Sequence, residues 1–168
     1  GGQASCTFCE PGRYIDIEGS TQCTNCSAYT YQNQIGMSNS SSCIQCSPGK
    51  YNHYPGQSSC NICEKGYYCI GDDRKVACAV GKYLNSSRGS KSSDCLDCKQ
   101  GYYNDLLGQA FCKSCMSGKY LNKTGMINEN NCTNCSVGKY SSIGGQASCT
   151  FCEPGRYIDI EGSTQCTN

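Results

Sequence analysis

The sequence predicts a small disulfide-rich fold, an elongated array of short irregular β-hairpin modules with little or no helix and no single core. Three observations predict it. Nineteen of the 168 residues are Cys, whereas Trp is absent and Phe occurs three times, so one shared apolar core is not expected. Cys-x-x-Cys doublets recur along the chain. No stretch shows an apolar period of 3.6 residues. Disulfides that close short loops stabilise such chains, by roughly 3 kcal/mol for a loop of about 15 residues.

Internal repeats define the organisation of the chain. Residues 1–25 recur unchanged as residues 144–168, an offset of 143 residues, and residues 44–63 match 133–152. We therefore expect the natural chain to repeat every 143 residues. The expected divisions are the end of a truncated module (1–8), a three-module block (9–63), an atypical spacer with an extra Cys pair (63–98), a second three-module block (98–152) and the start of the next period (152–168, identical to 9–25).

Each module follows one pattern: Cys, two residues, Gly, one residue, Tyr, a polar stretch and a closing Cys, as in Cys9, Gly12, Tyr14 and Cys23. The loops between successive doublets hold 13 or 16 residues. The Gly permits positive φ in a tight turn, and the segment around Tyr favours an extended strand. A small irregular hairpin closed at its base is the expected structure.

The segments 9–23, 46–60 and 135–149 carry this pattern most clearly. It resembles the ephrin-receptor-like cysteine-rich repeat and is similar to the first subdomain of tumour-necrosis-factor-receptor modules. The resemblance covers nearly the whole chain and implies an extracellular module. Such modules also occur in tandem-repeat proteins of the protist surface, including variant antigens and flagellar-hair proteins. Residues 63–95 depart from the pattern, because Cys69 and Cys78 stand there as single cysteines.

Two disulfide schemes fit the spacings. An interlocked scheme joins Cys6 to Cys23 and Cys9 to Cys26, and it leaves Cys166 over. The resemblance to the receptor subdomain favours a serial scheme, in which Cys6 is unpaired in this fragment because its partner is expected in the preceding period. The serial pairs are Cys9–Cys23, Cys26–Cys43, Cys46–Cys60, Cys63–Cys69, Cys78–Cys95, Cys98–Cys112, Cys115–Cys132, Cys135–Cys149 and Cys152–Cys166.

Zinc is the competing interpretation of the doublets, since ribbon-type tetrathiolate sites use similar spacing. Sequons overlap several doublets and the only His is His53, so we expect disulfides and no metal or other cofactor. No Ser-His-Asp order, phosphate-binding Gly loop or paired-carboxylate motif is present, and we expect no enzyme. Asp72 and Asp73 are interpreted as a solvated turn, because the other oxygens of a calcium loop are missing.

Glycosylation is the predicted modification. Covalent N-glycans would shield the exposed backbone of a thin protein from proteolysis and lateral aggregation. Asn39, Asn85 and Asn122 are favoured, since they lie in polar loops away from the doublets. The six sequons are those of Asn25, Asn39, Asn85, Asn122, Asn131 and Asn134.

The thirteen Tyr residues recur mostly as Gly-x-Tyr. A stacking ladder or a glycan-binding face is one interpretation. We favour the other, in which each Tyr supplies its small module with apolar surface while its hydroxyl stays in water.

The composition also restricts the function. A net charge of +1 without a basic stripe argues against nucleic-acid and anionic-lipid partners, and no apolar run in this stretch approaches a membrane span. Cys usage and sequons predict an extracellular or cell-surface location. The first hypothesis is a structural subunit of a glycosylated filament or surface hair that self-associates along its axis. The alternative is a stalk or ligand-binding ectodomain of a cysteine-rich surface protein, either receptor-like or antigenic.

Overall fold

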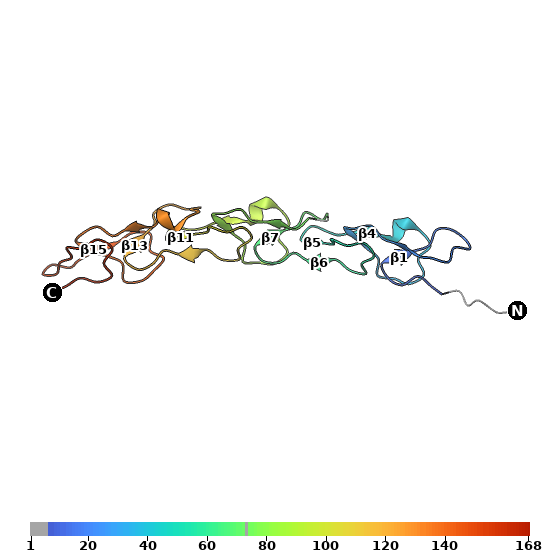
Figure 1. The fold of residues 1–168 in the computed structure, drawn as a ribbon, viewed down its shortest axis with the longest axis horizontal. Coiled ribbons are helices and arrows are strands. Elements are labelled where there is room, and N and C mark those ends of the chain that lie inside the picture. The colour runs from blue at the N-terminus through green and yellow to red at the C-terminus, as the bar shows by residue number, and fades with distance from the viewer. Residues whose placement is uncertain (1–6, 73) are drawn as a thin grey trace. The chain divides into compact units, whose positions relative to one another are not determined.

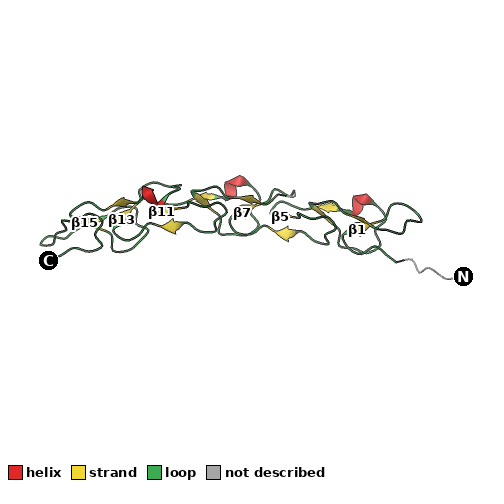
Figure 2. Ribbon diagram, viewed as in Figure 1, coloured by secondary structure: helices red, strands yellow, loops and turns green. Residues whose placement is uncertain are grey.

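The structure is a computed structural model that describes residues 7–72 and 74–168. Its strands are two residues long and form two-stranded sheets (Figure 1), and most of the described chain is turn and loop (Figure 2). The pairs are β1 (Arg13–Tyr14) with β2 (Thr24–Asn25), β3 (Thr30–Tyr31) with β4 (Ile44–Gln45), β5 (Lys50–Tyr51) with β6 (Asn61–Ile62), β7 (Tyr67–Tyr68) with β8 (Val76–Ala77), β9 (Lys82–Tyr83) with β10 (Leu96–Asp97), β11 (Tyr102–Tyr103) with β12 (Lys113–Ser114), β13 (Lys119–Tyr120) with β14 (Thr133–Asn134), and β15 (Lys139–Tyr140) with β16 (Thr150–Phe151).

Each hairpin combines the Tyr strand of one module with the two residues inside the following Cys doublet. In the first module, Arg13 pairs with Asn25 and Tyr14 pairs with Thr24 in antiparallel register. The N–H of Cys26 then donates to the carbonyl of Gly12 at 2.8 Å, which closes the hairpin at the next module. The sequence pattern predicted the strand at each Tyr. It did not predict that the two residues within the doublet form the return strand.

Helical structure in the described residues consists of three single-turn 3₁₀ helices, η1 (Ser40–Ser42), η2 (Ser92–Asp94) and η3 (Glu129–Asn131). All three lie in modules whose loops hold 16 rather than 13 residues, so the 3₁₀ turn takes up the additional length. Asn39 caps η1 by accepting a hydrogen bond from the N–H of Ser41. The prediction of a disulfide-rich hairpin fold with almost no helix is confirmed.

Successive modules are joined by one recurring backbone hydrogen bond. We call the residue three positions after the first Cys of a module its donor residue, and the residue six positions after that Cys its acceptor residue. The N–H of each donor residue bonds to the carbonyl of the next module's acceptor residue at 2.7–3.0 Å. The bonds join Gly12 to Gln32, Tyr29 to Asn52, Gly49 to Cys69, Gly66 to Leu84, Gly81 to Asn104, Gly101 to Leu121, Gly118 to Ser141 and Gly138 to Ile158.

The donor residue needs left-handed backbone, which favours Gly. Gly12 has a φ of +87°, and a Cβ built on it would overlap the carbonyl oxygen of Gly56 two modules along the chain. Tyr29 occupies the equivalent position in its module with a φ of +59°, the one donor position without Gly in the described chain. Both backbone conformation and close approach therefore explain the glycine of the Gly-x-Tyr motif.

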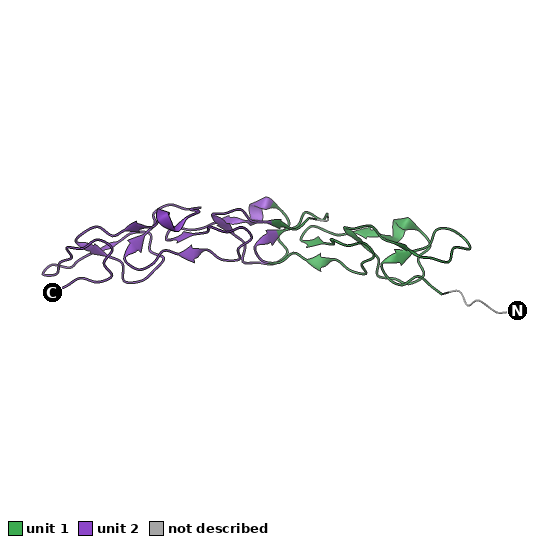
Figure 3. Ribbon diagram, viewed as in Figure 1, with its two compact units in different colours: residues 1–64, 68–76, 87–91 green, residues 65–67, 77–86, 92–168 purple. Residues whose placement is uncertain are grey.

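The chain divides into two compact units (Figure 3), residues 1–64, 68–76 and 87–91 in one and residues 65–67, 77–86 and 92–168 in the other. Burial within both units is local to the modules. Most first cysteines are buried, as are the acceptor residues from Gln32 onward. One small cluster in the second unit joins Tyr103, Cys115, Leu121 and Cys132. The expected absence of a single core is therefore confirmed for the described part of the chain.

Two equivalent glycines separate the effect of backbone conformation from that of module contact. Gly12 and Gly155 both have a φ of +87° and lie within identical sequence, but a Cβ on Gly155 would meet no atom within 4 Å. We expect Gly155→Ala to cost about 1–2 kcal/mol of stability from strain alone. Gly12→Ala should cost a further 1–3 kcal/mol or so, because the backbone of Gly56 must move. Denaturant unfolding with disulfides intact measures both; equal losses would contradict the module contact.

Candidate interaction surface

The structure contains nine disulfides, which join consecutive cysteines in the serial pattern from Cys9–Cys23 to Cys152–Cys166. The extra pair in the spacer is Cys63–Cys69, which closes a short loop with a sequence separation of 6. Their Cα–Cα distances of 5.6–5.9 Å are ordinary for disulfides. Cys6, predicted to be unpaired, lies outside the described residues.

The eighteen described cysteines are all oxidised, so none of them presents a thiolate to zinc or to a substrate. In residues 7–72 and 74–168, no group of three or more His, Cys, Asp or Glu side chains is arranged to hold a metal ion. Asp72 instead forms a 2.7 Å ion pair with Arg74. Partial burial would raise the pKa of Asp72, but hydrogen bonds from Arg74 outweigh it and lower that pKa. Asp73 lies outside the described residues.

All six sequon asparagines are exposed. Asn25 and Asn134 lie in the return strands β2 and β14, Asn39 caps η1, and Asn131 is in η3. The other two share one position in their modules: Asn85 and Asn122 each directly follow a buried acceptor residue, Leu84 and Leu121. Every predicted glycosylation site therefore faces solvent on the surface of a module.

Tyrosine side chains in the Gly-x-Tyr motifs are mostly half-buried, and Tyr103 is 7% exposed. Burial is the main cause that raises the pKa of Tyr103 above its usual value. Lysines lie over several rings: the Nζ of Lys75 is 5.8 Å from the centre of Tyr51, and that of Lys99 is 4.9 Å from Tyr102. These contacts fit the interpretation in which Tyr packs its own module.

Exposed ion pairs connect the two arms of individual hairpins. Lys82 and Asp97 are cross-strand partners in β9 and β10, and their charged atoms lie 2.6 Å apart. Lys113 Nζ lies 2.7 Å from Asp105 Oδ1. The hydrogen bond from Lys113 lowers the pKa of Asp105, and the same bond raises the pKa of Lys113. Solvent screens such pairs, so they orient the arms more than they stabilise the fold.

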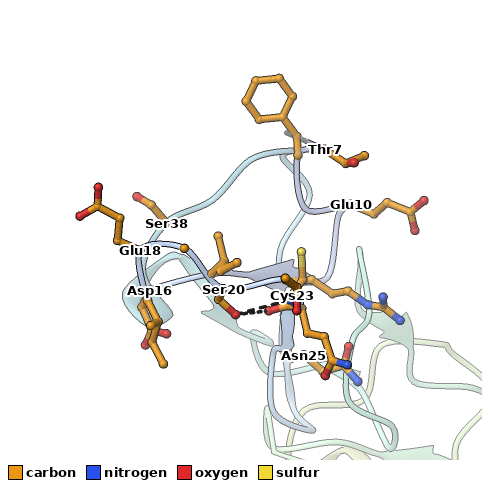
Figure 4. A pocket seen from close by; sticks show the side chains of 15 residues that line it. Thr7, Glu10, Asp16, Glu18, Ser20, Cys23, Asn25 and Ser38 are labelled. Atoms are coloured by element: carbon orange, nitrogen blue, oxygen red, sulfur yellow. Dashed lines mark hydrogen bonds between the residues drawn. The ribbon is translucent and has the colours of Figure 1, made fainter. Parts of the chain in front are cut away.

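The largest hollow lies at module 9–23, with a volume of about 1180 Å³. Figure 4 shows its lining, with Asp16 and Glu18 on the loop at one side and Glu10 at the other. The acceptor residue of this module, Ile15, also lines it. The hollow is open and polar at its rim. It holds carboxylates without a nucleophile, so it offers a surface for contact rather than a site for chemistry.

The same residues line a second, much smaller hollow at the other end of the described chain. Glu153, Arg156, Gln165 and Cys166 occupy the positions of Glu10, Arg13, Gln22 and Cys23 in the repeated sequence. There the hollow measures about 180 Å³, and Tyr140 of the preceding module forms part of its wall. One sequence thus has two surroundings.

Serial disulfides, solvent-exposed sequons and repeated small hairpins define the class of protein: a cysteine-rich extracellular module. A family model described as "Tyrosine-protein kinase ephrin type A/B receptor-like" matches residues 1–43, 81–132 and 126–168. The chain belongs to this family of ephrin-receptor-like cysteine-rich domains, as its sequence pattern predicted. Among curated proteins, none matches the sequence.

The family places the chain outside the cell or at the cell surface, as a receptor-like or surface module, and this kind of module is non-catalytic. Within the described ranges, no helix has both the length and the apolar character needed to cross a bilayer.

Disulfide mapping distinguishes the two schemes. We expect proteolysis of the unreduced protein to release peptides joined as Cys98–Cys112 and Cys115–Cys132, because these pairs bridge the arms within one module. The interlocked scheme would join Cys95 to Cys112 and Cys98 to Cys115 instead. Mass spectrometry of the linked peptides, with a reduced sample as control, identifies the pattern. Cross-module linkages would contradict the serial structure.

Proposed function

We propose that the chain is a structural subunit of a glycosylated extracellular filament or surface hair built from 143-residue tandem repeats. The observation that carries this proposal is the unchanged recurrence of residues 1–25 as 144–168. Identical sequence over that length points to equivalent surroundings at intervals of one period. Subunits along a filament axis have such surroundings, whereas the modules of a receptor differ in order to build one binding site.

The hydrogen bond between donor and acceptor residues supports the same proposal. It uses only main-chain groups, so modules with different side chains stack in the same way. Acceptor residues as different as Leu121 and Asn104 both serve. Because nothing in this contact limits the number of modules, an array of this kind extends by adding further copies.

N-glycans on the six exposed asparagines belong to the proposal. Asn25 and Asn134 are of particular interest, because they lie in exposed return strands. The outer edge of such a strand is open to pairing with another chain, and a bulky glycan there prevents lateral aggregation. Glycans on Asn39, Asn85 and Asn122 would extend from the loops.

The second candidate is a stalk or ligand-binding ectodomain of a cysteine-rich surface protein. The atypical spacer favours it, since the Cys63–Cys69 loop has no counterpart among the described modules and gives that part of the chain its own surface. Family membership is compatible with both candidates.

Electron microscopy of the native material tests the filament. One period contains eight modules, counted from Cys9 to Cys149, and each should advance the axis by about 10–15 Å. We expect an axial repeat of roughly 80–120 Å, or a simple multiple of it. Compact particles, or rods of fixed short length tethered to a membrane, would contradict the filament and favour the ectodomain.

Glycan mapping tests the modification. We expect Asn39→Gln, Asn85→Gln and Asn122→Gln each to remove one glycan mass from the secreted protein, because these exposed asparagines lie in sequons. Asn33→Gln is the matched control, since Asn33 is an exposed loop asparagine outside any sequon. Intact mass before and after enzymatic deglycosylation is the measurement. An unchanged mass for all three sequon variants would contradict glycosylation at these sites.

A further inference from the structure

We propose that module 9–23 docks module 152–166 of a second copy of this chain, so that copies associate head to tail. The proposal deepens the filament function and rests on it, because it names the contact by which one copy follows another. It is argued from the repeated sequence, which the structure shows with a preceding module in place and again without one among the described residues.

The contact with a preceding module is seen at module 152–166. We call this side of a module its leading face. The N–H of Gly138 donates to the carbonyl of Ile158 at 3.0 Å, and the N–H of Ser141 donates to the carbonyl of Ser163 at 3.2 Å. In return, the N–H of Gly162 donates to the carbonyl of Cys135 at 2.8 Å. Ile158 is 7% exposed under this contact.

The leading face of module 9–23 has the same groups in the open hollow. Ile15, Gly19 and Ser20 correspond to Ile158, Gly162 and Ser163, and all three line the 1180 Å³ hollow (Figure 4). Ile15 is half-buried here. A Cβ on Gly19 would meet no atom within 4 Å, which shows how open this face is within the described chain.

The opposite side of a module, its trailing face, contacts the following module. In module 9–23 it is covered: Gly12 donates to Gln32, Ile15 donates to Met37, and the carbonyl of Cys9 accepts from Gly36. Cys9 is accordingly 2% exposed.

In module 152–166 the trailing face is open. Cys152 is only half-buried, Gly155 is exposed and Tyr157 is 57% exposed. The trailing face of module 152–166 and the leading face of module 9–23 are therefore the two halves of a contact that the fold makes between its own modules.

Docking of one face on the other repeats that contact between copies. Gly155 N–H would donate to the carbonyl of Ile15, Ile158 N–H to that of Ser20, and Gly19 N–H to that of Cys152. The two faces differ, so the contact is heterologous and leaves one face of each kind free at the ends. Such contacts continue into open chains when their rotation does not close a ring.

Ile15→Lys is the test variant, because it places a charge on the leading face where the equivalent Ile158 is buried. Ile17→Lys is the matched control. Ile17 is 69% exposed, and its equivalent Ile160 is also 69% exposed although a preceding module is docked there. A charge at Ile17 should therefore leave docking unchanged. Tyr157→Asp alters the trailing face without touching module 9–23.

Sedimentation velocity of the full 168-residue chain over a concentration series is the measurement, after disulfide mapping of each variant. We expect the unaltered chain and Ile17→Lys to grow beyond dimers with concentration. Ile15→Lys and Tyr157→Asp should each lose association by at least about tenfold, the effect of some 1.4 kcal/mol. Mixed in equal amounts, these two variants should form a dimer and stop, because each retains the face that the other lacks.

A chain that remains monomeric throughout, or variants that associate like the unaltered chain, would overturn the docking; the latter result would assign association to another surface. The two proposals fail separately. An axial repeat in native material with a monomeric purified chain would overturn only the head-to-tail contact. Association of copies without any axial repeat in native material would overturn only the filament.

Discussion

The structure depends on the hydrogen bond between the donor residue of one module and the acceptor residue of the next. A module alone consists of a disulfide and two strands of two residues, which is too little to be stable in water. The stacked neighbour covers its first Cys and its acceptor residue. Cys26, Cys63 and Cys98 are each 0% exposed for this reason. Stability therefore accumulates from contacts between neighbours and from disulfides rather than from a core.

This division between main chain and side chain explains which positions vary. The acceptor residue is buried whether it is apolar, as in Leu84, or polar, as in Asn52. Its carbonyl makes the bond in every case, and the buried amide of Asn52 finds a partner in the carbonyl of Thr30 at 3.1 Å. By contrast, the donor residue is restricted by its positive φ and by the close approach of another module. Gly is accordingly the regular element of the motif, and the loops are free to carry sequons.

The same organisation links fold to function. Membership of the ephrin-receptor-like family establishes a non-catalytic extracellular or surface module. Oxidation of all described cysteines removes the chemistry that thiols would supply. What remains available is surface: exposed return strands, loop asparagines and the leading and trailing faces. A chain with these surfaces is suited to assembly and shielding, and the proposed filament and its head-to-tail contact follow from how identical modules present them.

The sequence by itself determined the module pattern, the hairpin at each Gly-x-Tyr, the near absence of helix and the family, because Cys spacing and Gly positions report local geometry directly. Sequence left the disulfide scheme open between serial and interlocked pairs, since both fit the spacing. It also gave no sign that the residues inside each doublet form the return strand. Only the tertiary structure decided which faces are covered. Ile15 and Ile158 have identical neighbours in sequence, yet Ile15 is half-buried and Ile158 is buried, because burial here depends on the module stacked above.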